Sequence, residues 1–331
     1  MIRQWEAERA WFPGRPNSVY FGGGTPSQAD PSELARILAA VDPAEGAEVS
    51  AEVNPGRLDA GRLGDLHAIG VNRVSLGVQS FQPAVARRLA RAHSAREGRE
   101  VYDAARKIGF ASISVDLMFA VPGQTVTDFE RDLDVICADP PQHVSLYGLT
   151  IEPDTPFGRA EGRLGLSDEA DDLWREMYDL AVERLEAIGL DRYEVSNFAA
   201  SGHRCLHNEH YWRARPWVGL GASAHGFRPD HRRTRSTPAV DPYIVDPMPV
   251  VEVVPPMELA AEIVGSTLRH VDGLDLDHLA ALTGLTLSAP EWMLRRGTVC
   301  QEGETLRIRK KDVPVLDHVA MRLCQRLRPA R

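Results

Sequence analysis

The sequence predicts an α/β fold, in which a partial parallel (β/α) barrel is followed by a small C-terminal helical domain. From residue 18 to about 150, apolar segments of strand length alternate with helical periods, which is typical of repeated βα units. Beyond residue 257 the chain is helical apart from one late strand. With 331 residues, it is long enough for one barrel-sized domain and a smaller one.

Five barrel strands are expected, and helical periods separate them. The strands lie at residues 18–21, 47–53, 73–78, 112–118 and 143–149, and the helices at 31–41, 58–69, 83–92, 96–108 and 126–137. Their β-branched and apolar content, without clean alternation, favours parallel strands that are buried on both faces. Ser94 and Thr125-x-x-Asp128 are helix start signals, and Gly70 and Gly109 stand where helices end.

The second half of the chain predicts a different organisation. A long amphipathic helix at 167–188 leads into a strand at 193–196, and a loop-rich stretch rich in Arg and His follows from 199 to 240. We therefore expect a barrel core at 1–241, a proline- and valine-rich linker at 242–256, and a helical, winged-helix-like domain at 257–331.

Composition excludes several classes of protein. A net charge of −9 provides no global basic field for nucleic acid. No apolar run approaches the ~18 residues that span a bilayer, and the charged start of the chain is not typical of a secretory signal, so a cytoplasmic location is expected. The four cysteines, at 137, 205, 300 and 324, are widely scattered, and their spacing matches neither a zinc ribbon nor a local cluster loop.

Two groups of residues at predicted strand ends are candidates for ligand binding. Gly22-Gly23-Gly24-Thr25-Pro26 directly follows a strand, and its glycines allow close approach of a ligand, although a tight strand–helix turn also uses glycine. Glu52, Gln79 and Asp116 lie near the carboxyl ends of strands, which share one face of a parallel barrel. The alternative for the two carboxylates is a core ion pair with Arg73 or Arg91.

Several short motifs follow one another along the chain. They are Tyr20-Phe-Gly-Gly-Gly-Thr-Pro-Ser27, Ala51-Glu-Val-Asn-Pro55, Gly77-Val-Gln-Ser-Phe81, Val121-Pro-Gly-Gln-Thr125, Tyr193-Glu-Val-Ser-Asn-Phe198, His207-Asn-Glu-His-Tyr-Trp212 and Gly219-Leu-Gly-Ala222. In that order they resemble the oxygen-independent coproporphyrinogen oxidase family of radical S-adenosylmethionine (SAM) proteins, most closely its haem-chaperone branch. The resemblance implies a radical SAM barrel with SAM at the strand ends. The residues it implies for SAM are Gly23, Gly24, Thr25, Glu52, Gln79, Arg91 and Asp116.

The resemblance also implies a haem-binding segment at His207, Asn208, Tyr211 and Trp212. A neutral imidazole is a normal axial haem ligand, and aromatic rings offer faces for a porphyrin. Guanidinium groups could bind its propionates, and the arginines nearby are 204, 213, 215, 228, 232, 233 and 235. Two alternatives remain open: Tyr211 and Trp212 are core residues, or Cys205, His207 and His210 bind zinc.

One element of the family is absent from the sequence. Family members hold a 4Fe–4S cluster in a Cys-x3-Cys-x2-Cys loop, and this sequence contains no such loop. We therefore expect a chain that is shortened at its start, a cluster-free paralogue or the product of a damaged gene, in each case with no first barrel strand. Radical chemistry is not expected of the chain as written, because thiolates must hold the cluster.

The function expected from the resemblance is that of a haem chaperone, which binds haem and SAM and transfers haem to recipient haem proteins. Peripheral contact with membrane respiratory proteins is part of this expectation, and a nucleic-acid partner is not. The alternatives are an oxygen-independent coproporphyrinogen III oxidase, which decarboxylates propionates oxidatively, and a zinc hydrolase that uses the His-rich segment.

Overall fold

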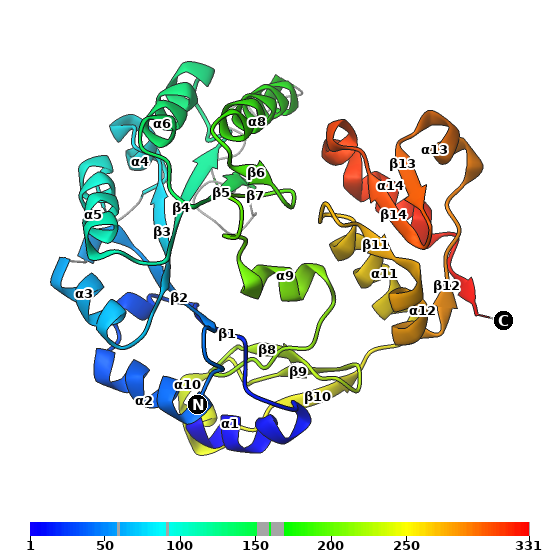
Figure 1. Ribbon diagram of the computed structural model, residues 1–331, viewed down its shortest axis with the longest axis horizontal. Helices are drawn as coiled ribbons and strands as arrows, with labels where there is room; N and C mark the ends of the chain where they lie inside the picture. Colours follow the sequence, from blue (N-terminus) through cyan, green and yellow to red (C-terminus); the bar gives the residue numbers. More distant parts are fainter. Residues whose placement is uncertain (58–59, 91–92, 151–158, 160–168, 331) are drawn as a thin grey trace. The chain divides into compact units, whose positions relative to one another are not determined.

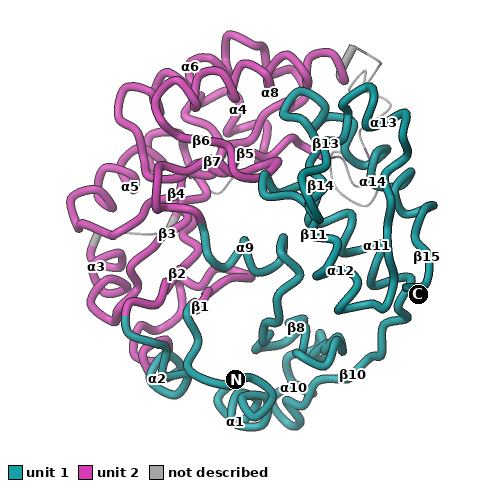
Figure 2. Tube along the Cα trace, turned by 45° about the vertical axis from the view of Figure 1, so that its right-hand side comes forward, with its two compact units in different colours: residues 1–17, 37–45, 205–331 teal, residues 18–36, 46–204 magenta. Residues whose placement is uncertain are grey.

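The computed structural model describes residues 1–57, 60–90, 93–150, 159 and 169–330. The chain divides into two compact units (Figure 2). Residues 18–36 and 46–204 form one, here named the barrel unit. Residues 1–17, 37–45 and 205–331 form the other, here named the second unit.

The barrel unit contains a seven-stranded sheet in the order β1-β2-β3-β4-β5-β7-β6 (Figure 1). Neighbouring strands from β1 to β5 are parallel, and β7 pairs antiparallel with both β5 and β6. The strands are β1 (Ser18–Phe21), β2 (Glu48–Val53), β3 (Arg73–Gln79), β4 (Ser112–Phe119), β5 (His143–Gly148), β6 (Asp191–Arg192) and β7 (Asn197–Ala199). The five expected barrel strands form within one residue of their expected bounds, which confirms the α/β fold class.

Helices cover one face of this sheet (Figure 1). They are α3 (Ala60–Ala68), α4 (Pro83–Arg88), α5 (Ala95–Ile108), α6 (Val126–Ala138) and α8 (Glu169–Ala187), while α2 (Pro31–Val41) contributes residues to both units. The capping boxes of α5 at Ser94 and of α6 at Thr125 both form, and Gly109 ends α5 with a left-handed φ of 87°. Three start and stop signals in the sequence are thereby confirmed.

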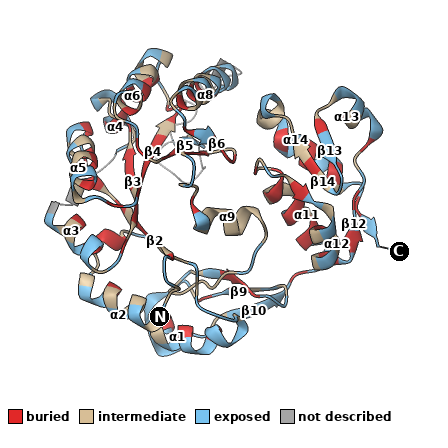
Figure 3. Cartoon of the chain, viewed as in Figure 1, coloured by how far each residue is buried: buried red, intermediate tan, exposed pale blue. Residues whose placement is uncertain are grey.

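Polar and apolar residues alternate along the parallel strands, so the expectation of no clean alternation was wrong. β4 reads Ser112-Ile-Ser-Val-Asp-Leu-Met-Phe119, and its register sets Ser114 beside Ser75 on β3 and His143 on β5. One face is therefore apolar and packs against the helices, and the other carries Ser, Asp, Glu, Arg and His side chains. Much of this polar face is nevertheless buried (Figure 3). Many of its residues are serines, which are small and only weakly polar, so the alternation is hard to recognise from the sequence alone.

The strand expected at 193–196 does not form. These residues connect β6 to β7, which make a short antiparallel pair. The Tyr178 hydroxyl on α8 donates to the Val195 carbonyl over 2.7 Å, and the Asn197 amide donates to the buried Glu194 carboxylate. Side-chain hydrogen bonds therefore fix this connection where a strand ladder was expected.

In the second unit, helix α1 (Ile2–Glu8) buries two polar side chains that are one turn apart. The Gln4 amide donates to the Gly219 carbonyl and the Ser236 hydroxyl over 3.1 and 3.0 Å, and accepts from Gly221 N–H and the Tyr243 hydroxyl over 3.1 and 2.7 Å. Glu8 forms a two-pronged, buried ion pair with Arg228. These bonds join α1 to segments more than 200 residues away.

The remainder of the second unit is more ordered than expected. The loop-rich stretch contains α9 (Leu206–Trp212), β8 (His225–Phe227) and β9 (Arg232–Arg235), and the expected linker contains most of α10 (Val240–Val245) and β10 (Val250–Val253), which pairs with β9. The C-terminal segment contains α11 (Pro256–Thr267), α12 (Leu276–Thr283), α13 (Glu291–Arg296) and α14 (Leu316–Cys324), with the strands β11 (Leu274–Asp275), β14 (Thr305–Ile308) and β13 (Val299–Glu302) in one sheet and β12 (Leu285–Thr286) with β15 (Arg328–Pro329) in another. The division of the chain at a linker of residues 242–256 stays a prediction.

Among the described residues, none of the helices has the length and apolar character that crossing a membrane requires.

Candidate functional site

The glycine loop after β1 closes over a carboxylate of the neighbouring strand. Glu52, at the end of β2, accepts hydrogen bonds from Gly23 N–H over 3.2 Å and from the Tyr20 hydroxyl over 3.1 Å. A Cβ at Gly22 would lie 2.7 Å from the Tyr20 ring and 3.1 Å from Glu52. The loop therefore needs glycine at position 22 so that the carboxylate can approach the backbone this closely.

The next two glycines leave open space. Gly23 and Gly24 adopt left-handed φ values of 76° and 66°, and a Cβ at either would meet no atom within 4 Å in the described structure. Thr25 follows at the start of a short 3-10 helix without using its side chain as a cap. The backbone of the loop is thus accessible to a ligand, as the sequence predicted.

Asp116 on β4 is held by hydroxyl groups. Ser75 donates to both carboxylate oxygens over 2.9 and 3.1 Å, and Ser114 donates to one of them over 3.4 Å. Burial of the carboxyl raises the pKa of Asp116 to about 6, and the negative charge of Glu52 contributes to the increase, although the hydroxyl donors oppose it. The buried Asp116 carboxyl, with the negative charge of Glu52 raising its pKa, forms a site suited to a cationic group.

The ion-pair alternative for these carboxylates fails for Arg73. In the described structure, this buried guanidinium lies 3.6 Å from Glu48, and it donates to the Ser112 hydroxyl over 2.9 Å and to the His203 carbonyl over 3.0 Å. Arg73 therefore binds groups at the start of the strands and does not pair with Glu52 or Asp116. Arg91, the other candidate, lies outside the described residues.

Gln79 ends β3 in a strained conformation. Its φ is +68°, the pairing of β3 with β4 shifts register at this point, and its buried Oε1 atom has no hydrogen-bond donor among the described residues. A left-handed glutamine with an unpaired buried oxygen is costly. Such a combination is found where a side chain is held ready for a ligand.

The loop beyond Gln79 is anchored by Asp132, a residue that the sequence analysis missed. This fully buried carboxylate on α6 accepts from the Ser80 hydroxyl and from Phe81 N–H, both over 2.7 Å. It lies between Phe129 and Leu133 on the core-facing side of the helix. An acidic residue at a position that should be apolar was the available signal.

A second buried group continues from Asp116 across the polar face of the sheet. The Ser114 hydroxyl is 2.8 Å from Nδ1 of His143, and Nε2 of His143 is 2.9 Å from the Tyr193 hydroxyl. Burial lowers the pKa of His143 well below its usual value, so the imidazole is neutral. His143, also missed in the sequence, therefore links the carboxylate site to the Tyr193 motif.

Helix α9 places the second group of candidate residues. His207 and Tyr211 are one turn apart with rings in edge-to-face contact at 4.8 Å, and Tyr211 makes a similar contact with Trp217 at 4.6 Å. Burial lowers the pKa of His207 to about 4 and raises that of Tyr211 to about 12, so both side chains are neutral at pH 7. The buried indole N–H of Trp212 has no acceptor among the described residues. Asn208 is half-buried in the same helix.

Glu209 fastens α9 to the C-terminal segment. Its carboxylate lies 3.3 Å from Nε2 of His270 and 3.1 Å from Arg213, which also pairs with Asp272 over 2.6 Å. The hydrogen bond from His270, with Arg213 assisting, lowers the pKa of Glu209 to about 2. The helix is thus held by its own charged residues.

Most of the arginines expected near α9 are already occupied. Arg213, Arg228, Arg232 and Arg233 form ion pairs with carboxylates, and Arg204 stacks over the Tyr193 ring. In the described part of the chain, Arg215 and Arg235 have no ion-pair partner. They are the remaining candidates for binding an anionic ligand in the second unit.

Comparison with known proteins identifies the family. Residues 4–136 match the radical SAM superfamily. The haem chaperone HemW of Bacillus subtilis (strain 168) is 35% identical over 223 residues, covering 65% of this chain and 58% of its own. The mitochondrial radical S-adenosyl methionine domain-containing protein 1 of Bos taurus is 32% identical over 348 residues, covering 96% of this chain and 77% of its own. The chain belongs to the coproporphyrinogen oxidase-like family of radical SAM proteins.

The fold of this radical SAM protein agrees with that assignment. It superposes on coproporphyrinogen III oxidase (HemN) from Escherichia coli with a TM-score of 0.77 at 19% identity, over 98% of this chain and 81% of that one. HemW of Escherichia coli (strain K12) is 35% identical over 244 residues, and 64% of it is covered. The chain thus spans about three fifths of the HemW proteins it matches, and the likeness to the oxidase concerns the fold.

Membership of the radical SAM superfamily implies SAM and a 4Fe–4S cluster, and the two fit the residues of this chain differently. The unpaired Gln79 oxygen and the open glycine loop suit a polar, cationic ligand such as SAM. The cysteines at 137, 205, 300 and 324 are scattered in the sequence and form no disulfide in the described structure, so they do not provide the Cys-x3-Cys-x2-Cys loop that holds such a cluster. Among the described residues, no three His, Cys, Asp or Glu side chains are grouped to hold a metal ion, so the zinc alternative at Cys205, His207 and His210 finds no support.

Proposed function

We propose that this radical SAM family member is a haem chaperone, which binds haem on α9 and delivers it to recipient haem proteins in the cytoplasm. The observation that carries the proposal is the composition of α9, where a neutral His207 lies beside Tyr211 and the buried Trp212 indole N–H meets no acceptor in the described parts of the chain. Neutral imidazole is the form that ligates haem iron. Relatives at 35% identity are named haem chaperones, which supports the same function.

SAM would bind at the carboxyl ends of β1 to β4 as part of this function. Gly23, Gly24 and Thr25 would face its amino-acid end, and Glu52 and Asp116 would hold its ribose hydroxyls and ammonium group. Gln79 would use its unpaired oxygen. SAM in this family supplies radical chemistry together with a cluster, and the residues of this chain give no basis for that step.

Haem titration of the full chain tests the proposal. Wild-type protein is expected to bind haem stoichiometrically with a shifted Soret band, and His207→Ala is expected to weaken binding at least ~10-fold because an iron ligand is lost. His225→Ala, which removes an exposed histidine from β8, is the matched control. Wild-type protein without a Soret shift would refute the chaperone function, while equal behaviour of the two variants would refute His207 as ligand.

The competing function is oxidative decarboxylation of coproporphyrinogen III. It predicts consumption of that substrate and no stable haem complex. Incubation of the full chain with coproporphyrinogen III, SAM and a reductant separates the two, since the chaperone leaves the substrate unchanged.

A further inference from the structure

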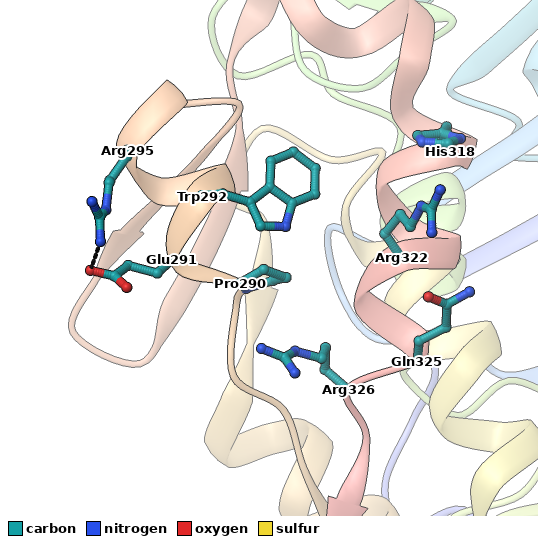
Figure 4. A pocket seen from close by; sticks show the side chains of 8 residues that line it. All are labelled: Pro290, Glu291, Trp292, Arg295, His318, Arg322, Gln325 and Arg326. Carbon is teal, nitrogen blue, oxygen red and sulfur yellow. Dashed lines mark hydrogen bonds and ion pairs between the residues drawn. The ribbon is translucent and has the colours of Figure 1, made fainter.

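A basic groove lies between α13 and α14, far in sequence from the residues discussed above. It has a volume of about 670 Å³ and is lined by Pro290, Glu291, Trp292, Arg295, His318, Arg322, Gln325 and Arg326 (Figure 4). In Figure 4, the Trp292 indole points from α13 toward α14, while Arg295 turns away and pairs with Glu291. The open side of the groove is thus formed by an aromatic ring facing basic side chains.

Two arginines of the groove, Arg322 and Arg326, have no acidic partner in the part of the chain that the structure describes. Arg322 and Arg326 take part in no side-chain hydrogen bond or ion pair among the described residues, whereas Arg269 on the nearby α11–β11 connection is paired with Asp317. Trp292 is also 50% exposed, which is costly for a large ring unless a partner covers it.

The spacing of the basic residues indicates the shape of the ligand. His318 and Arg322 are four residues apart on α14, which sets them ~6 Å apart along the helix axis, and Arg326 continues the row beyond the end of the helix. In an extended peptide, side chains on one face recur every ~6.6 Å. A compact anion would contact one of these side chains, while an extended chain with alternate carboxylates would contact both arginines and His318.

We propose that this groove binds an extended acidic segment of a partner protein, with carboxylates at alternate positions and an apolar or aromatic side chain against Trp292. Arginine forms two-pronged hydrogen bonds with carboxylates. A nucleic-acid strand is disfavoured, because Glu291 and Asp317 border the row and residues 257–331 contain 11 basic against 10 acidic residues. The proposal does not depend on haem binding, so the two can fail separately.

The test is a fluorescence anisotropy titration of the full chain with a labelled peptide Glu-Phe-Glu-Ala-Glu, compared with the same peptide carrying Gln for Glu. The acidic peptide is expected to bind and the Gln peptide is not. Arg322→Gln and Arg326→Gln are each expected to weaken binding about tenfold, because each removes a charge-assisted contact, and Trp292→Leu is expected to weaken it further. Lys311→Gln is the control, since it removes one exposed charge of the same segment outside the groove.

Three results would overturn the proposal. Equal binding of the two peptides would remove the role of charge. Equal effects of Arg322→Gln and Lys311→Gln would place the contact outside the groove. Tighter binding of a labelled oligothymidylate, abolished by the same arginine variants, would make the groove a nucleic-acid site.

Discussion

Asp132 combines full burial with a role in holding the loop that carries Gln79. Burial raises its pKa to about 6, although hydrogen bonds from Ser80 and Phe81 oppose the increase. Between pH ~4 and 6 the folded protein therefore binds a proton that the unfolded chain does not. The stability from this group is present at low pH and is lost as the pH rises through 6.

Asp132→Asn should remove this pH dependence while it keeps an acceptor for the loop. Relative to wild type, the variant is expected to gain up to about 3 kcal/mol in free energy of unfolding between pH 4 and 7.5. Urea unfolding at both pH values measures the difference. Asp134→Asn is the control, because Asp134 lies on the same helix as Asp132 but is exposed and pairs with Arg184 of α8. An identical pH response of the two variants would show that the raised pKa of Asp132 does not affect stability.

At the scale of single residues, the sequence predicted the positions of Glu52, Gln79 and Asp116 on β2, β3 and β4, because the ends of parallel strands meet on one face of a barrel. Their roles in ligand binding stay predictions. The sequence did not locate Asp132 or His143. Their partners depend on the register between elements, and a residue's own neighbours in sequence carry little information about that. Their roles could be recognised only once β3, β4 and α6 were placed.

Helix α5 is an element whose start the sequence specifies locally. The Ser94 hydroxyl accepts from Glu97 N–H, and the Glu97 carboxylate accepts from Ser94 N–H. Both bonds lie within four residues, so tertiary packing is not needed to form them. The helix bounds from Ala95 to Ile108 accordingly differ from the expected range by one residue.

Ser94→Ala should destabilise the protein by about 1 kcal/mol, because an N-cap serine is lost and Glu97 loses its partner. Thermal unfolding measures the change. Ser266→Ala is the matched control, since that hydroxyl donates back to the Glu262 carbonyl within α11 and its loss should have little effect. A Ser94→Ala variant as stable as the control would show that packing alone positions α5.

Helix α9 shows where local sequence is insufficient. Its seven residues include two histidines and an asparagine and lack a side-chain cap, so nothing in the segment alone predicts a helix. The bond between Glu209 and His270, 61 residues apart in sequence, supplies the missing stabilisation. The valine-rich segment before residue 256 likewise contains a strand that its own sequence did not predict, because β10 pairs with β9 and not with a neighbouring segment of the chain.

For the molecule as a whole, the valines of β10 affect behaviour in solution. β10 is an edge strand whose four residues are all exposed, with Val250 and Val253 67% and 71% accessible. An exposed apolar edge favours association between molecules. The net charge of −9 opposes such association only over long distances.

The double variant Val250→Glu and Val253→Glu should remain dispersed at concentrations where wild type aggregates. The new carboxylates would lie opposite Arg235 and Arg232 on β9, so the pairing of the two strands should be kept. Light scattering against concentration measures the effect, with Val250→Thr and Val253→Thr as the uncharged control. Unchanged scattering would show that aggregation begins elsewhere.

The contacts of Gln4 delay the folding of helix α1 during synthesis of the chain. Its farthest partner, Tyr243, lies 239 residues later. At translation rates of ~5–20 residues per second, the side chain stays without that partner for roughly 10–50 s after it leaves the ribosome. During this interval helix α1 cannot complete its buried contacts, so the nascent chain is a candidate for capture by general folding factors until about three quarters of the protein has been made.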